Sequence, residues 1–188
     1  MIREYLKNFL PRSDVITQIK QNKSHDILVV GGGIHGAAFA RLAALNGFET
    51  VLLERYDYAS GVSSKSSKMA HGGLRYLENF DFKQVFEGVK AREELLEIAN
   101  NVAHPCDFLV PVKKGDWFFS TKLKIGLSLY DLFLRNRKRS HRRVGPESET
   151  MELFGSDKDL YDGGYIYSDG ILDDARLVLN TILAAREE

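Results

Sequence analysis

Three glycines and one acidic residue form the pattern in this sequence that points most directly to chemistry. Gly31, Gly33 and Gly36 have the spacing G-x-G-x-x-G. Glu54 follows about 20 residues after the motif. In such a motif the first glycine permits a tight turn, the second lets backbone approach a diphosphate, and the third lets a helix pack closely on a strand. The acid accepts hydrogen bonds from ribose hydroxyls. The pattern therefore predicts a site for a dinucleotide.

The elements predicted around these residues occur in the order that the site requires. Ile27–Val30 is a short apolar run typical of a buried strand, and Thr50–Leu53 is a second one. Between them, Ile34–Asn46 is rich in Ala and Leu and predicts a helix. The N-terminus of that helix offers backbone N–H groups and a partial positive charge to a diphosphate. The alternative is a strand–helix–strand unit whose glycines serve packing alone.

A serine-rich stretch, VSSKSSKMAHGGLRYLE over Val62–Glu78, is the second informative part of the chain. Its first seven residues contain four serines and two lysines, which make it too polar for a core. Serine hydroxyls and a further helix N-terminus here can hold a second phosphate or the flavin end of a dinucleotide. Gly72 and Gly73 let the backbone lie close to a flat ring.

These stretches resemble the FAD-dependent glycerol-3-phosphate dehydrogenases and the related glycerophosphate oxidases. The resemblance is carried by GGGIHG, LLE and SSKSSKMAHGGLRYLE, and again by YSDGILDDARLVL over Tyr167–Leu179. It covers the chain from Asp26 to Arg186. Two positions depart from the family pattern: Val62 stands where Thr is frequent, and Ala70 where a larger aliphatic residue is usual. The departures put one hydrogen bond to FAD and some packing in doubt.

The resemblance implies FAD as cofactor and assigns residues to it and to the substrate. Along FAD it places the glycines and the acid of the first motif together with Ser63, Ser66, Ser67 and Lys68. Facing flavin and substrate it places His71, Arg75 and Tyr76. Oxidation of a secondary alcohol then transfers a hydride to flavin N5, with sn-glycerol 3-phosphate as substrate, dihydroxyacetone phosphate as product, and quinone or oxygen as electron acceptor.

The chemistry of the three side chains suits those implied roles. His71 titrates near neutral pH and can accept or orient the hydroxyl proton. Arg75 is permanently charged and planar, which suits a phosphate or a developing ketone oxygen. Tyr76 can donate a hydrogen bond to the phosphate. The alternative is a helix-capping His71 and a surface Arg75, and the identity of the general base stays open.

The expected fold is α/β: a Rossmann-type FAD/NAD(P)-binding domain with the beginning of an inserted α+β substrate domain. We expect a helical extension over 1–24, the FAD-binding unit with its serine-rich loop over 25–104, and the start of the substrate domain with a following helix over 105–188. Because family members continue further, we expect this chain to be an N-terminal fragment that is inactive alone.

Periodicity predicts the remaining elements. Apolar residues on one helical face predict a helix over Ile2–Phe9, and a second helix is expected to run through Lys20 with Ser13 and Asp14 as its cap. Asp81–Ala103 is expected to be an amphipathic helix that Pro105 ends, and Ile125–Leu134 an apolar helix. The last expected helix is Ala175–Arg186, capped by Asp173 and Asp174. The expected strands are Phe108–Val112, Trp117–Phe119, and Tyr165–Ser168 turned by Asp169 and Gly170. Gly155–Gly164 is expected to be a polar loop.

Composition bounds the possible partners. The 188 residues include 26 basic and 26 acidic ones, so the zero formal net charge gives no reason to expect a nucleic acid. A single cysteine excludes an internal disulfide and fits a reducing compartment. The N-terminus does not resemble a signal peptide, and no apolar run reaches the roughly 18 residues of a membrane span. We expect a cytoplasmic protein without a bound metal.

A basic run, RNRKRSHRR over Arg135–Arg143, follows the apolar Ile125–Leu134. Six of its nine residues are Lys or Arg, which suits docking on anionic lipid. Nucleic acid is a second interpretation, although the run lacks aromatic residues for stacking. A solvated helix end is the third. The resemblance favours a peripheral position on the cytoplasmic face of the inner membrane, because those dehydrogenases deliver electrons to membrane quinone.

Two rival functions remain open at this stage. The first is another flavoenzyme, an amine or amino-acid oxidase that uses the same nucleotide-binding unit but lacks HGGLRYLE. The second is a fragment without enzymatic activity that only binds a nucleotide.

Overall fold

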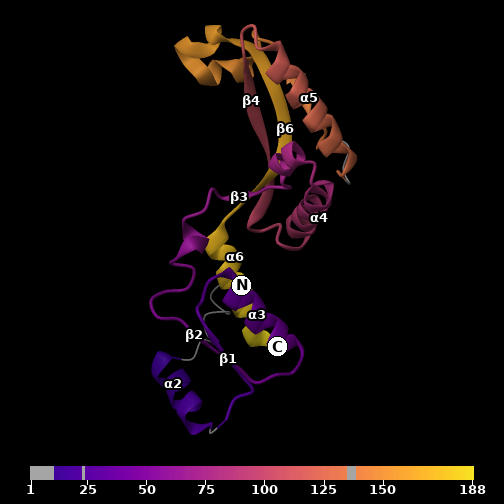
Figure 1. The fold of residues 1–188 in the computed structure, drawn as a ribbon. Coiled ribbons are helices and arrows are strands. Elements are labelled where there is room, and N and C mark those ends of the chain that lie inside the picture. The colour runs from indigo at the N-terminus through magenta and orange to yellow at the C-terminus, as the bar shows by residue number, and fades with distance from the viewer. Residues whose placement is uncertain (1–10, 23, 135–138) are drawn as a thin grey trace. The chain divides into compact units, whose positions relative to one another are not determined.

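The computed structural model describes residues 11–22, 24–134 and 139–188. The chain forms two compact units, Met1–Ser66 with Asp174–Glu188 and Ser67–Asp173 (Figure 1). The domain boundaries expected from the sequence, after residues 24 and 104, stay a prediction. The helix predicted over Ile2–Phe9 lies outside the described residues, as do positions 135–138 of the basic run.

The first unit is built on a strand–helix–strand arrangement, as the sequence predicts. Strands β1 (Ile27–Val30) and β2 (Thr50–Leu53) pair in parallel, and α3 (Ile34–Leu45) connects them. Helix α6 (Asp174–Glu187) packs on α3. Small side chains make this packing close, because the shared core consists of Ala37, Ala59 and Val178 with the partly buried Ile34, Ala175 and Ile182.

Part of one face of the β1–β2 pair is exposed in this unit. The exposed fractions of its side chains are 61% for Leu28, 80% for Val30 and 46% for Leu53, whereas Val29 on the opposite face of β1 is buried. The outward face therefore presents apolar surface to solvent.

Two smaller elements also lie among the described residues of the first unit. Helix α2 (Arg12–Gln21) begins after Pro11 and has no side-chain cap. The prediction that Ser13 and Asp14 cap this helix is therefore wrong: the N-cap position is occupied by Pro11, and both residues lie inside the first turn. A short 3-10 helix, η1 (Val62–Ser64), carries the first serines of the serine-rich stretch.

The second unit contains an antiparallel sheet organised around one long strand. Strand β6 (Tyr161–Leu172) pairs along its length with β4 (Ala103–Lys113). On its other edge it pairs with β3 (Met69–Ala70) and, nearer its start, with β5 (Arg142–Val144). Residues from before and after position 104 thus belong to the same sheet and to the same compact unit.

Two helices cover one face of this sheet (Figure 1). Helix α4 (Phe82–Ile98) begins at Asp81, whose carboxylate accepts a hydrogen bond from the Gln84 N–H. Helix α5 (Trp117–Leu132) begins in the same way at Asp116. Beneath them lie two clusters of buried side chains: Val85, Val89, Tyr130 and Leu134 in one, and Val112, Leu127 and Tyr165 in the other.

Three sequence predictions about this unit are wrong. Trp117–Phe119 is not a strand but the first turn of α5, because Asp116 caps the Phe119 N–H at 3.0 Å. Pro105 does not end α4, which stops at Ile98; it lies in β4, a strand whose outer edge needs no proline N–H. Asp169 and Gly170 do not turn the last strand, because β6 continues to Leu172.

The segment predicted as a polar loop is also partly regular. Its first half belongs to η4 (Glu149–Leu160), a kinked 3-10 helix with Gly155 at the kink, and its second half begins β6. Within the described ranges, no helix combines the length and the apolar character needed to cross a membrane.

Candidate functional site

The glycine turn joins β1 to α3 at very close range. Gly31 has a φ of +113°, which favours glycine, and its N–H donates to the Leu53 carbonyl at 2.8 Å. Gly33 is the N-cap of α3. At Gly36, an added Cβ would overlap the Gly31 carbonyl oxygen. Only glycine therefore allows the first turn of the helix to lie against the end of the strand.

This turn presents donors for an anion. In the described part of the chain, the backbone N–H groups of Gly33, His35 and Gly36 find no acceptor in the protein. The Ile34 N–H is satisfied by the Ser63 hydroxyl oxygen at 3.2 Å. Free N–H groups at a helix N-terminus bind phosphates with the help of the helix dipole. The residues present fit the diphosphate of a dinucleotide.

Glu54 lies beside the same turn, at the end of β2. Its Oε2 atom accepts from the Gly32 N–H at 2.6 Å and its Oε1 atom accepts from the Tyr56 N–H at 2.8 Å. The hydrogen bonds from Tyr56 and Gly32 lower the pKa of Glu54, so it is a carboxylate at neutral pH. A carboxylate has about four acceptor sites, which leaves capacity for ribose hydroxyls.

The serine-rich stretch is divided between the two units. Ser63 contacts the start of α3, and the Ser66 hydroxyl donates to the Asp174 carboxylate at the start of α6. Ser67 and Lys68 belong to the second unit, where the Lys68 carbonyl accepts from the Leu172 N–H at 2.9 Å. The φ of Lys68 is +61°, an uncommon backbone conformation for a residue with a side chain.

The second unit carries the three predicted catalytic residues on one segment. After β3, the 3-10 helix η2 (Leu74–Asn79) follows Gly73, whose φ is +80°. His71, Arg75 and Tyr76 are exposed on this segment. Leu74 and Leu77 point the other way and pack against the two buried clusters under α4 and α5. The segment therefore has an apolar inner side and a polar outer side.

The structure thus groups the predicted site residues in two sets. The first unit holds the glycines, Glu54, Ser63 and Ser66, and the second unit holds Ser67, Lys68, His71, Arg75 and Tyr76. The cofactor and catalytic roles of these residues stay predictions.

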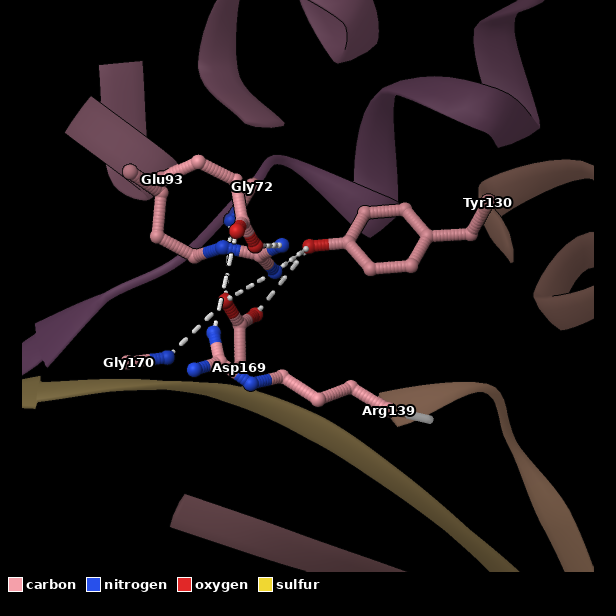
Figure 2. A network of polar contacts seen from close by, with 7 residues as sticks. Gly72, Glu93, Tyr130, Arg139, Asp169 and Gly170 are labelled. Carbon is pink, nitrogen blue, oxygen red and sulfur yellow. Dashed lines mark hydrogen bonds and ion pairs between the residues drawn. The ribbon is translucent and has the colours of Figure 1, made fainter. Parts of the chain in front are cut away.

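Sequence reasoning missed a polar network that joins Gly72 to α4, α5 and β6, which Figure 2 shows. Arg92 donates from Nη1 to Asp169 Oδ1 at 3.0 Å and to the Tyr130 hydroxyl at 2.8 Å. All three residues are buried. Asp169 Oδ1 also accepts from the Gly72 N–H at 3.1 Å. A signal existed in the sequence: Val85, Val89 and Arg92 occupy one helical face, so a charged residue stands on an apolar stripe.

Burial fixes the protonation state of the tyrosine in this network. Burial raises the pKa of Tyr130, the nearby Asp169 carboxylate raises it further, and Arg92 opposes the rise. The hydroxyl therefore stays protonated. Since Arg92 can only donate, the Tyr130 oxygen accepts from it and turns its own proton toward Asp169 Oδ2 at 3.5 Å.

Comparison with known proteins places the chain among flavoenzymes. The sequence profile of the family described as FAD dependent oxidoreductase matches residues 26–188. A solved structure with the same fold, the glycerol-3-phosphate dehydrogenase from Bacillus halodurans complexed with FAD, has a TM-score of 0.61 and 27% identity. The match covers 94% of this chain and 27% of that one.

Three similar curated proteins have related names. A glycerol-3-phosphate dehydrogenase from Synechocystis is 39% identical over 171 residues, covering 89% of this chain and 31% of that protein. A D-erythritol 1-phosphate dehydrogenase from Brucella abortus is 42% identical over 171 residues, covering 86% and 32%. An alpha-glycerophosphate oxidase from Streptococcus pyogenes is 37% identical over 179 residues, covering 91% and 29%. The chain spans about a third of the length of the curated relatives it matches.

Proposed function

The chain belongs to the FAD-dependent oxidoreductase family, and on that premise we propose that it supplies FAD-binding and catalytic residues of an enzyme that oxidises sn-glycerol 3-phosphate to dihydroxyacetone phosphate. The observation that carries the proposal is the outward display of His71, Arg75 and Tyr76 on one short segment. The names of the relatives support the substrate. The start of α3, where Gly36 admits no side chain, supports the cofactor.

The residues of the first unit bind and orient the cofactor in this proposal. The N–H groups of Gly33, His35 and Gly36 bind the diphosphate, and Glu54 accepts hydrogen bonds from the adenosine ribose. Ser63 holds the start of α3 through the Ile34 N–H, which leaves the neighbouring N–H groups pointing at the anion. FAD, when bound, supplies the acceptor for the substrate hydride at its N5 atom.

The residues of the second unit act on the substrate. Arg75 binds the phosphate of the substrate or the developing ketone oxygen, since its planar charge suits either anion. Tyr76 donates a hydrogen bond to the phosphate. His71 accepts or orients the proton of the secondary hydroxyl. These roles need exposed side chains on a fixed backbone, and the segment after β3 provides both.

Substitution of Arg75 tests the proposal in the FAD-loaded protein at its full natural length. Arg75→Ala is expected to lower kcat/KM for sn-glycerol 3-phosphate about 100-fold or more, because a charge-assisted bond to the substrate is lost. Arg75→Lys keeps the charge and is expected to lose less. Steady-state kinetics and stopped-flow measurement of flavin reduction by the substrate check the effect. Unchanged flavin reduction in Arg75→Ala would contradict the proposal.

A second substrate has support from one observation. The Brucella relative, which is named for D-erythritol 1-phosphate, is 42% identical. Both substrates are polyol phosphates, so the same phosphate-binding Arg75 serves either. Comparing kcat/KM for the two substrates separates them, and an amine or amino-acid oxidase would reduce its flavin with neither.

The electron acceptor and the membrane surface are proposed from the resemblance and from the basic run. We propose that electrons pass to quinone and that the protein lies on the cytoplasmic face of the inner membrane. Two described side chains of the run form ion pairs within the protein. Arg139 Nη1 lies 3.7 Å from Glu93 Oε2, and Arg142 Nη1 lies 3.2 Å from Asp107 Oδ2. Flotation with anionic and with neutral vesicles tests the surface, and peroxide formation in air without a quinone analogue would favour oxygen as acceptor.

A further inference from the structure

We propose that Arg92, Tyr130 and Asp169 are positioning residues, which hold the catalytic segment His71–Tyr76 in a single conformation for its substrate. This inference rests on the proposed function of the segment. None of the three side chains reaches the outer side where His71, Arg75 and Tyr76 are exposed, because all three are buried beneath it. They act through the backbone of Gly72.

The network contacts the segment at Gly72 (Figure 2). Its N–H donates to Asp169 Oδ1 at 3.1 Å, and this oxygen also accepts from Arg92 and from the Gly170 N–H. One carboxylate oxygen therefore joins β6, α4 and the catalytic segment. A charged acceptor makes the hydrogen bond to Gly72 stronger than one between neutral groups.

Shape complements these hydrogen bonds. A Cβ at Gly72 would overlap the Tyr130 hydroxyl and would lie 2.7 Å from Val89 Cγ2. A Cβ at Gly88 on α4 would lie 2.9 Å from the Gly72 carbonyl oxygen. Gly72 is thus enclosed by two helices, and its backbone has no room to shift toward them.

The network is balanced in charge, which allows it to remain buried. Arg92 pairs with Asp169 at 3.0 Å and with Glu93 at 2.6 Å. Glu93 in turn lies 3.7 Å from Arg139. Two cations and two anions therefore alternate from Asp169 in β6 to Arg139 within the basic run. In some proteins, buried ionic groups fix one arrangement of the structure although they add little to its stability.

The neighbours of Gly72 are the residues whose placement matters for the substrate. His71 directly precedes it, and Gly73, with its left-handed backbone, directly follows and starts η2. Leu74 and Leu77 anchor the inner side of the same segment. With Gly72 fixed, the directions of the exposed His71, Arg75 and Tyr76 side chains are set by a backbone that is held at both ends.

Hydrogen exchange tests the grip without relying on activity. In the FAD-loaded protein at full natural length, Asp169→Asn is expected to speed amide exchange over Ala70–Leu77 about tenfold or more, since a buried hydrogen bond to a charge is weakened. Tyr130→Phe removes only a hydroxyl and is expected to have a smaller effect in the same segment. The matched control is Asp107→Asn, which breaks the exposed ion pair with Arg142 in the same sheet.

Kinetic constants then test whether the hydrogen bond to Gly72 affects binding and oxidation of the substrate. Asp169→Asn and Tyr130→Phe are expected to raise KM for sn-glycerol 3-phosphate and to lower kcat per bound FAD, together about tenfold or more in kcat/KM. Partial unfolding would lower the amount of active enzyme but would leave KM unchanged. Asp107→Asn is expected to match the wild type in both constants.

The outcomes separate this inference from the proposed function. A wild-type protein that does not oxidise the substrate overturns the proposed function, while the exchange data still judge the grip on Gly72. Exchange over Ala70–Leu77 that is unchanged in both variants overturns the inference. So does faster exchange that extends equally to α3, or an unchanged KM in an active enzyme, because either result reduces the network to a general structural role.

Discussion

At the scale of single residues, the third glycine of the turn offers a sharp test. Gly36→Ala is expected to lower the free energy of unfolding by about 1–3 kcal/mol and to abolish FAD binding, because the new methyl group would overlap the Gly31 carbonyl oxygen. Thermal unfolding and FAD titration measure the two effects.

The matched control for that substitution is Gly61→Ala, directly before the serine-rich stretch. A Cβ at Gly61 would meet no atom within 4 Å, and its φ is −84°. This variant is expected to bind FAD like the wild type. Equal behaviour of the two alanine variants would show that the turn is not built as the structure has it.

Glu54 predicts a pH dependence of stability. Hydrogen bonds from Tyr56 and Gly32 lower its pKa in the folded state, so its contribution is fully present above the ordinary carboxyl pKa. The contribution is lost as the pH falls through the lowered pKa. Glu54→Gln is therefore expected to melt at a lower temperature than wild type at pH 7, and the difference should shrink toward pH 3. A constant difference across this range would contradict the assignment.

At this scale, the sequence predicts those features of the site that depend on residues close together along the chain. The spacing of Gly31, Gly33 and Gly36 with Glu54 is a local pattern, and the structure places these residues around one turn. The pairing of Arg92 with Asp169 joins residues 77 positions apart. Such a partner cannot be chosen before the strand and the helix are known to meet, although the buried position of Arg92 could have been noticed.

At the scale of elements, two helical glycines predict opposite effects of the same substitution. Gly126→Ala in α5 is expected to raise the free energy of unfolding by about 0.5–1 kcal/mol, because a Cβ there meets nothing within 4 Å and alanine restricts the unfolded chain. Gly88→Ala in α4 is expected to lower it, since its Cβ would lie 2.9 Å from the Gly72 carbonyl oxygen. Urea unfolding checks both, and stabilisation by both would refute the close contact.

The type of an element could be predicted where the hydrophobic periodicity extends over many residues. The prediction was wrong where a capping residue determines the element. The amphipathic pattern of α4 predicts its helix well. Trp117–Phe119 has the aromatic composition of a strand, but Asp116 caps it as a helix. Asp169 and Gly170 look like turn residues, yet pairing of β6 with β3 and β4 keeps them extended. Tertiary pairing outweighs local preference at these positions.

At the scale of the whole molecule, zero net charge and a bare apolar face predict association. Leu28 and Val30 project from the exposed face of β1, and no net charge opposes contact between copies at pH 7. Replacing both with Thr in the 188-residue chain is expected to reduce light scattering at pH 7 with little change in melting temperature.

The control for this prediction lies on the same strand. Val29 is buried on the opposite face of β1, so Val29→Thr is expected to lower the melting temperature and to leave association no weaker. If the double variant scattered as strongly as the wild type, association would have to arise on another surface.

The two compact units depend on pairings between distant parts of the chain. Strand β6 pairs with β3 and with β4, which lie far before it in the sequence. Helix α6 then leaves for the first unit and packs on α3. A boundary that depends on one returning strand and one returning helix has no local sequence signal.

The two-sided character of the segment after β3 bears on how new specificities can arise. Leu74 and Leu77 anchor its inner side, whereas the outward residues contribute nothing to the buried clusters. Exchanging the outward residues should therefore cost little stability. A library randomised at positions 75 and 76 alone would then yield mostly well-folded proteins. Because Arg75 and Tyr76 are the proposed phosphate ligands, a protein that prefers an alcohol with another polar group in place of the phosphate could be selected from it.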